Sequence, residues 1–317
     1  MRPSSFLRAK FPVRLSHSTV TPWPVRSSFD EWLTQEIDGL QRWWKESYVS
    51  THWLIDVVNL AVDTQKMTMD TLKDIVYDEG ERKVIEDYLE EVVELLDACN
   101  RLRERVEIVQ NYIDCLRGVL SCFEGRSTPM LARARVVLDS CEAMERRCSN
   151  LEKCCSSLRK LGDKISQGCV GIKLNPYESH LKEVLSGSKA VALLACGSLG
   201  FSLSFKSKRG FHVSQSHQTN SWSSSLHNLH KEVKEEVEKQ RKFGRVVLIE
   251  LREAVVAAQS LRALLGSTEP NWNAVEALSR KCEKLEEGIE PLGGGLNELY
   301  RHLISIRMVL LGILSNA

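Results

Sequence analysis

Four cysteines within twenty-one residues form the densest group of potentially reactive side chains in this sequence. The stretch LDSCEAMERRCSNLEKCCSSL, residues 138–158, contains Cys141, Cys148, Cys154 and Cys155. Thiolates so close in sequence could bind zinc, form disulfides or act as nucleophiles. Structural zinc sites use ligand pairs such as C-x2-C on a turn, whereas Cys141, Cys148 and Cys155 recur every seven residues. On a helix this spacing separates neighbouring thiols by about 10 Å, which is too far for one metal ion or one disulfide.

The residues around these cysteines continue the same spacing with apolar side chains. Steps of three and four connect Ala134, Val137, Cys141, Met144, Cys148, Leu151, Cys155 and Leu158. Such a pattern is the buried seam of an amphipathic helix, in which a free cysteine acts as a small apolar group. Only Cys154 lies one position off the seam. We therefore interpret the other three cysteines as core residues.

Four histidines gather near a serine-rich stretch, where they could bind a transition metal. They are His212, His217, His227 and His230. No cysteine or carboxylate stands beside them at a ligand spacing, so we interpret them as solvated side chains. The triplet at 293–295, GGG, follows no strand and lacks the lysine of a phosphate-binding loop. Since G-x-S-x-G, H-E-x-x-H and E-x-x-H motifs are also absent, we predict no catalytic, cofactor-binding or metal-binding residues and no enzyme activity.

Basic and acidic residues almost balance, with 43 Lys and Arg against 42 Asp and Glu. The resulting formal charge of +1 creates no field that attracts nucleic acid, so we expect no nucleic-acid partner. The opening segment, residues 1–27, differs because it contains five basic residues and no acid, together with several serines and prolines. This composition is typical of a disordered basic tail or of a transit peptide. We expect a cytoplasmic protein, with the chloroplast as the alternative.

Apolar residues at steps of three and four predict long helices through most of the chain. Ser28 and Glu31 form a capping box at the start of the first helix, which ends before Tyr48. We group residues 28–165 as an N-terminal helical part. Its expected helices run from 28 to about 47, from 51 to 75, over the seam 85–120, and from 129 to an end near 162–168.

The pattern weakens in the middle of the chain and returns in the C-terminal third. Residues 166–225 form a weakly patterned apolar segment followed by a polar, serine-rich loop. From Leu226 we expect one helix of about forty residues that passes Leu261. PLGGG, residues 291–295, is expected to split the last apolar stretch into two helices. Residues 226–317 would then complete the same all-α structure, an elongated antiparallel bundle of long amphipathic helices.

One segment has membrane character, AVALLACGSLGFSLSF at residues 190–205. At 1.5 Å per residue it would span about 24 Å, which is short against a hydrocarbon core of about 30 Å. Its serines also lower its hydrophobicity, but Lys206, Lys208 and Arg209 follow at once. A buried helix, an interfacial membrane contact and a true span all remain open. We expect a reversible peripheral contact through residues 190–209, because basic residues beside an apolar stretch favour an anionic leaflet.

Three helical segments of this sequence occur in the same order as similar segments in a known protein family. They are HWLIDVVNLAVDTQKMTMDTL at 52–72, DEGERKVIEDYLEEVVELLDACNRL at 78–102, and LEEGIEPLGGGLNELYRHLISIRMVLLGIL at 285–314. Together they resemble the plant BYPASS family, and the likeness covers most of the chain from about Phe29 onward. Relatives have charged helix-forming residues where this chain has glycines at 293–295. The resemblance therefore implies one helix that runs through these glycines.

The resemblance implies a non-enzymatic plant developmental regulator. Its expected role is to limit production of a root-derived mobile signal that arrests shoot growth, so that roots and shoots develop normally. Relatives in the wider family resemble partners of an exocyst subunit. The alternative function is therefore an adaptor in secretion or membrane traffic, which binds protein partners through helical surfaces. The family pattern implies no site residues and no cofactor.

Overall fold

The computed structural model describes residues 27–44, 48–74, 79–124, 128–147, 158, 160–161, 180–205, 220–242, 246–265 and 271–316. Within these ranges the chain forms α-helices and one short 3-10 helix, and no strand. The all-α class predicted from the sequence is thus confirmed. The elements are α1 (Ser28–Trp44), α2 (Thr51–Asp74), η1 (Glu79–Glu81), α3 (Arg82–Glu124), α4 (Thr128–Arg147), α6 (His180–Ser202), α7 (Ser221–Lys242), α8 (Ile249–Leu264) and α9 (Trp272–Asn316).

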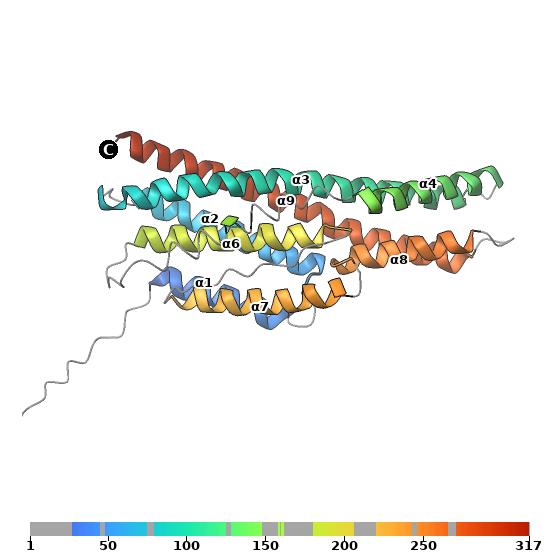
Figure 1. The fold of residues 1–317 in the computed structure, drawn as a ribbon, viewed down its shortest axis with the longest axis horizontal. Helices are drawn as coiled ribbons and strands as arrows, with labels where there is room; N and C mark the ends of the chain where they lie inside the picture. Colours follow the sequence, from blue (N-terminus) through green and yellow to red (C-terminus); the bar gives the residue numbers. More distant parts are fainter. Residues whose placement is uncertain are drawn as a thin grey trace, which may run out of the picture.

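Two long helices, α3 and α9, run side by side along the molecule and set its elongated shape (Figure 1). They are antiparallel, because Phe123 near the end of α3 packs against Trp272 at the start of α9, with ring centroids 6.4 Å apart. Farther along, Arg103 lies over the ring of Tyr300 at 5.7 Å from its centroid. Helices α4 and α8 lie towards one end of this pair, and α1 and α7 lie along a side of the bundle (Figure 1).

Helix α9 is continuous through Pro291 and the three glycines. The expected split at 291–295 is therefore wrong, and the single helix implied by the family resemblance is confirmed. The physical reason is that Ile289, Leu292 and Leu296 keep the apolar stripe in the core through this stretch, each at 1% exposure or less. Tertiary packing outweighs the low helix propensity of glycine and proline, as it commonly does.

Two glycines of α9 allow it to approach α2 closely, and the two helices run parallel. A Cβ added at Gly295 would lie 2.8 Å from Cγ1 of Val58, and one at Gly288 would clash with Thr51. These contacts join Thr51 to Gly288 and Val58 to Gly295 at the same offset. Neighbouring helices in the bundle therefore run both parallel and antiparallel.

The expected single helix from Leu226 past Leu261 is wrong, because the chain forms α7 and α8 instead. Between them Val246, Val247 and Leu248 are consecutive and all buried, at 9%, 1% and 0% exposure. One face of a helix cannot bury three successive side chains, whereas an extended segment between two helices can. Leu248 has φ −62° and ψ 125°, which is an extended conformation.

The first helix is capped one residue earlier than the capping-box pattern predicts. The hydroxyl of Ser27 accepts the backbone N–H of Asp30 at 3.0 Å, while Ser28 is exposed. Asp30 in turn accepts the N–H of Trp222 at 3.1 Å, and the amide of Gln41 donates to Glu232 at 2.6 Å. These bonds join α1 to α7 in a parallel pair.

The apolar segment belongs to α6, which starts at His180, ten residues before the predicted segment. It is the one described helix that is long and apolar enough to cross a membrane, yet 78% of its most apolar window is buried inside the protein. Core helices of soluble proteins have the same composition. Its polar groups are also engaged, since Ser188 donates to Gln65 at 2.8 Å and Lys189 pairs with Glu91. Of the three alternatives, the buried helix agrees with the burial of residues 190–205. Residues 206–209 lie outside the described residues.

Candidate functional site

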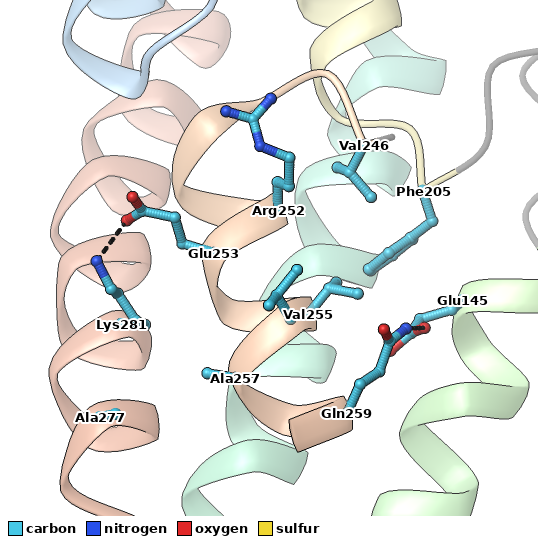
Figure 2. A pocket seen from close by; sticks show the side chains of 11 residues that line it. Glu145, Phe205, Val246, Arg252, Glu253, Val255, Ala257, Gln259, Ala277 and Lys281 are labelled. Atoms are coloured by element: carbon cyan, nitrogen blue, oxygen red, sulfur yellow. Dashed lines mark hydrogen bonds and ion pairs between the residues drawn. The ribbon is translucent and has the colours of Figure 1, made fainter. Parts of the chain in front are cut away.

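A cavity of about 600 Å³ lies beside α8, between it and the neighbouring helices α4 and α9. Figure 2 shows Phe205 and Val246 on one side of α8 and Lys281 on the other. The apolar lining is aliphatic with one aromatic ring, and the polar lining consists of paired side chains. The residues that line it are Glu145, Phe205, Val246, Arg252, Glu253, Val255, Val256, Ala257, Gln259, Ala277 and Lys281.

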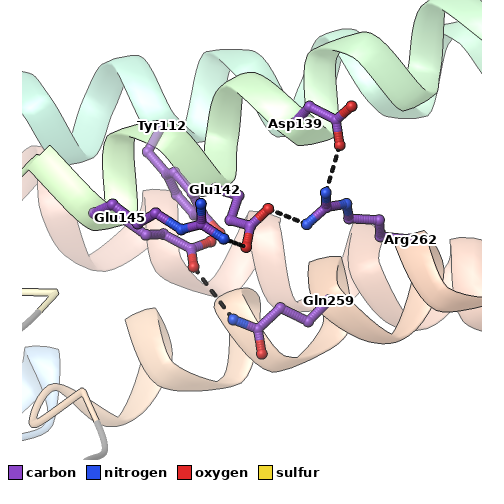
Figure 3. Close-up of polar contacts among 7 residues, drawn as sticks. Tyr112, Asp139, Glu142, Glu145, Gln259 and Arg262 are labelled. Atoms are coloured by element: carbon purple, nitrogen blue, oxygen red, sulfur yellow. Dashed lines mark hydrogen bonds and ion pairs between the residues drawn. The ribbon is translucent and has the colours of Figure 1, made fainter.

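A buried carboxylate, Glu145, connects three helices at this cavity (Figure 3). The hydroxyl of Tyr112 in α3 donates to Glu145 at 3.0 Å, and the amide of Gln259 in α8 donates at 3.2 Å. Burial, together with the Glu145 charge, raises the pKa of Tyr112 far above its ordinary value, so the phenol stays protonated and remains a donor. Both carboxylate oxygens of Glu145 are therefore engaged in holding α3, α4 and α8 together.

A second polar group lies one turn away on the same two helices. Arg262 of α8 pairs with Glu142 and, at 2.8 Å, with Asp139, and Arg146 also pairs with Glu142 (Figure 3). The Arg262 hydrogen bond lowers the pKa of Glu142, which stays ionised at neutral pH. On the other side of α8, Lys281 pairs with Glu253 at 2.8 Å. The polar contacts around the cavity thus join helices to one another.

Outside the cavity, Trp43 is the most exposed large apolar side chain in the described part of the chain, at 83% exposure. It lines a groove of about 370 Å³ between α1 and α2, together with a second tryptophan, Trp32. Carboxylates lie along the same groove at Glu36, Asp56 and Asp63. Indole faces and carboxylates are the groups that recognise lysine and arginine side chains of a protein partner.

The cysteine interpretation is tested at Cys141, which lies on α4 at 1% exposure. Burial raises the pKa of its thiol to about 12, so it carries almost no thiolate at neutral pH. Cys141 is a core residue, as the helical seam predicts. Cys148, Cys154 and Cys155 lie outside the described residues, as does the expected end of that helix near 162–168.

The histidine interpretation is wrong for His230, which is buried at 8% exposure on α7. Burial, followed by the neighbouring His227, lowers the pKa of His230 to about 4. His230 is therefore a neutral core residue and not a solvated one. His212 and His217 lie outside the described residues. Within the described ranges, no three His, Cys, Asp or Glu side chains are grouped so that they could hold a metal ion.

The side chains that connect α3, α4 and α8 were not identified from the sequence. Glu145 lies 33 residues from Tyr112 and 114 from Gln259, so no local spacing reveals the group. One signal was present in the sequence, because Glu145 directly follows the seam residue Met144 and therefore lies close to the buried face of its helix. This position suggests a buried partner only when the helix that packs against it is known.

Taken together, fold and contacts define an elongated helical bundle whose described polar clusters hold helices together and whose outer faces carry exposed apolar side chains. A family model described as Protein BPS1 matches residues 65–313, which is most of the chain. The chain belongs to this family, the plant BYPASS family of developmental regulators. No curated protein and no solved structure matched it.

Proposed function

We propose that this protein is a non-enzymatic regulator of plant development that limits production of a root-derived mobile signal able to arrest the shoot. Family membership supports the developmental role in general. The proposed mode of action is binding to other proteins. We infer that loss of the protein would raise the signal in roots, and that roots and shoots both need the protein for normal growth.

The proposal of binding rests on one observation, which is that the polar side chains at the cavity are already hydrogen-bonded or paired with one another. Glu145 is fixed by Tyr112 and Gln259, and Lys281 by Glu253, so these side chains are occupied in structural contacts. Val256, which also lines the cavity, is 55% exposed. With Phe205, Val246 and Val255 it forms an apolar lining inside a paired polar rim, which suits an apolar side chain of a protein partner.

Reciprocal grafting tests the developmental role directly. A wild-type shoot grafted to a root that lacks the protein should arrest, whereas a mutant shoot on a wild-type root should grow. Arrest that follows the genotype of the shoot would contradict a root-derived signal. Complementation of the mutant root with Val256→Asp should fail if this surface acts by binding, while Val136→Asp should complement, because Val136 is 65% exposed on α4 away from the cavity.

The alternative, an adaptor that binds an exocyst subunit, is favoured by the groove between α1 and α2. Its exposed Trp43 would act as an anchor for a partner segment that carries lysine or arginine. Purified exocyst subunits should be tested one by one for binding to the wild-type chain and to Trp43→Ala. Binding of one subunit that falls at least about tenfold in the variant would support the adaptor. Equal binding by both proteins, or none, would contradict it.

We propose a cytoplasmic location with a reversible membrane contact through the basic residues that follow α6. The observation that supports a loose contact is the burial of α6 itself, which leaves little apolar surface for the bilayer. In fractionation, high salt should release the bound protein. Residues 1–27 fused to a reporter test the chloroplast alternative, since import of the reporter into plastids would contradict a cytoplasmic location.

A further inference from the structure

The described residues that line the groove between α1 and α2 carry negative charge and no positive charge. They include three carboxylates, Glu36, Asp56 and Asp63, and neither lysine nor arginine. Lys66 lies beside the groove at 3.2 Å from Asp63, but it also pairs with an acid of α9 and so does not neutralise the groove by itself. Arg42 directs its Nε atom back to a carbonyl of α1 at 3.2 Å. The groove therefore suits a segment that carries positive charge.

The α1 wall of this groove is hollow at its centre. Trp32, Glu36, Gly39 and Trp43 follow steps of four, three and four, so they lie on one face of the helix. A Cβ added at Gly39 would meet no atom within 4 Å, which leaves space between the two indoles. These indoles are separated by about 16 Å along the helix. The wall can therefore hold an extended segment with an aromatic ring near each end.

The chain itself supplies a basic segment directly before α1. Residues 1–26 contain Arg2, Arg8, Lys10, Arg14 and Arg26 and no acid. The guanidinium group of arginine can stack on an indole and also pair with a carboxylate, which are the two groups that line the groove. Groove and segment thus have opposite charge and matching chemistry on one chain.

The basic segment enters α1 at one end of the groove. Only residues 45–50 separate α1 from α2, and both helices line the groove, so they run antiparallel and place Asp63 near the start of α1. Ser27 and Trp43 are separated by about 24 Å along the helix. The thirteen steps from Arg14 to Ser27 extend over up to about 43 Å. Arg14 can therefore reach Trp43 even after the chain has reversed its direction.

We propose that residues 1–26 turn back along α1 and occupy this groove, with Arg14 over the indole of Trp43 and Arg26 near Asp63. The contact is intramolecular, so it forms at an effective concentration of about 1 mM and needs no high intrinsic affinity. Another basic segment enters the groove only after residues 1–26 have left it. This competition rests on the proposed adaptor function, whereas the docking of residues 1–26 does not.

Limited trypsin digestion of the full-length chain measures the contact, because docking protects the peptide bond after Arg14. Trp43→Ala removes the indole, Glu36→Lys introduces repulsion, and Gly39→Leu fills the groove. Each variant should raise the initial rate of cleavage after Arg14 at least about threefold, because cleavage follows the population of the open form. Glu94→Lys makes the same charge change at an exposed site of α3 and should leave this rate unchanged. None of the four substituted residues is buried, so circular dichroism and thermal unfolding should show folded variants.

Chemical cross-linking of the full-length chain locates the segment. Lys10 is the only lysine between residues 1 and 26. A carbodiimide, which joins an amine directly to a carboxylate, should link Lys10 to Glu36, Asp56 or Asp63, and peptide mass spectrometry identifies the partner. A mixture of isotopically labelled and unlabelled chains shows whether each link lies within one chain. Trp43→Ala and Gly39→Leu should lower the yield of these links, and Glu94→Lys should not.

Equal cleavage rates in the wild type, Trp43→Ala and Gly39→Leu would overturn the proposal. Links from Lys10 to carboxylates outside the groove would also overturn it. Links that form only between two chains would assign the groove to the segment of a second copy instead. Neither measurement contains an exocyst subunit, so their failure contradicts the docking and not the adaptor function. A chain that docks its own segment but binds no subunit contradicts the adaptor function alone.

Discussion

The Sγ atoms of Cys99 and Cys196 lie 3.8 Å apart where α3 packs on α6, and neither side chain is exposed to solvent. The hydrogen bond between the two thiols and their burial raise the pKa of Cys196 well above its ordinary value. The Cys196 thiol therefore stays protonated at neutral pH. The protonated, buried form is a poor nucleophile.

The first prediction is that these thiols do not react in the folded protein. At mildly alkaline pH, an aromatic disulfide reagent should leave Cys99, Cys196 and Cys141 unmodified until denaturant is added. Burial keeps the reagent away from all three thiols and suppresses the thiolate of Cys196 and Cys141. Mass spectrometry of labelled peptides measures this. Val136→Cys supplies a reactive, exposed control. Rapid modification of Cys196 without unfolding would show that the α3–α6 contact opens readily.

The second prediction concerns acid stability. His230 has a folded-state pKa of about 4, below the ordinary value of 6.5 that it regains on unfolding. Its contribution is therefore fully present above pH 6.5 and is lost as pH falls towards 4, by about 3 kcal/mol in the free energy of unfolding. Urea unfolding at several pH values between these limits measures it. His230→Gln should flatten the pH dependence, and an unchanged profile in this variant would contradict a buried neutral histidine.

The third prediction compares two glycines of one helix. Gly288→Ala should lower the free energy of unfolding by about 1–3 kcal/mol, because the added methyl group meets Thr51. Thr51 cannot move easily, since its N–H donates to the buried carboxylate of Glu250 at 3.0 Å. Gly294 faces open space, so Gly294→Ala should stabilise the helix by up to about 1 kcal/mol. Thermal unfolding that ranks the two variants in the opposite order would contradict the packing of α2 on α9.

The fourth prediction is that Tyr112→Phe destabilises the protein by about 1–3 kcal/mol, because it leaves the buried Glu145 with one donor fewer. Chemical denaturation of the variant gives this value. The exposed hydroxyl of Ser140 bonds only within α4, so Ser140→Ala is a suitable control and should change stability little. Equal stability of both variants would mean that solvent satisfies Glu145.

The fifth prediction concerns the buried helix α6. Leu199 has no solvent exposure, so Leu199→Asp should bury a charge and cost more than about 4 kcal/mol, enough to unfold most domains of this size. Circular dichroism should show lost helicity and expression should yield aggregated protein. A folded Leu199→Asp protein that only leaves the membrane fraction would instead place this face of α6 in contact with lipid.

The helices were predictable where apolar spacing and tertiary packing agree, as in α2 and α3. At Gly293–Gly295 local propensity predicts a break, but the buried stripe of Ile289, Leu292 and Leu296 maintains the helix. The opposite error occurred at Val246–Leu248, where apolar residues fit a helical pattern although all three are buried in a non-helical segment between α7 and α8. The spacing of apolar residues shows which side chains can be buried. It cannot decide whether a continuous helix or a non-helical segment between two helices buries them.

The candidate site was less predictable than the fold. Trp43 lies one position off the apolar face that Leu33, Ile37 and Leu40 form, so the helical pattern gave no indication that it lines a groove. Tyr112, Glu145 and Gln259 meet only after three helices have packed. Long-range groups of this kind leave no local pattern when each member also fits an ordinary helix.

The pairing of α1 with α7 has a consequence for how the protein is made. Gln41 and its partner Glu232 are 191 residues apart. At about 5–20 residues per second, a ribosome needs roughly 10–40 s to synthesise that interval. For most of this time Phe29, Leu33 and Ile37 have left the ribosome before α7, or α6 with its Gly187 beside Phe29 and Leu33, has been completed. Newly made chains should therefore depend on chaperones that hold the first helix until synthesis has passed α7.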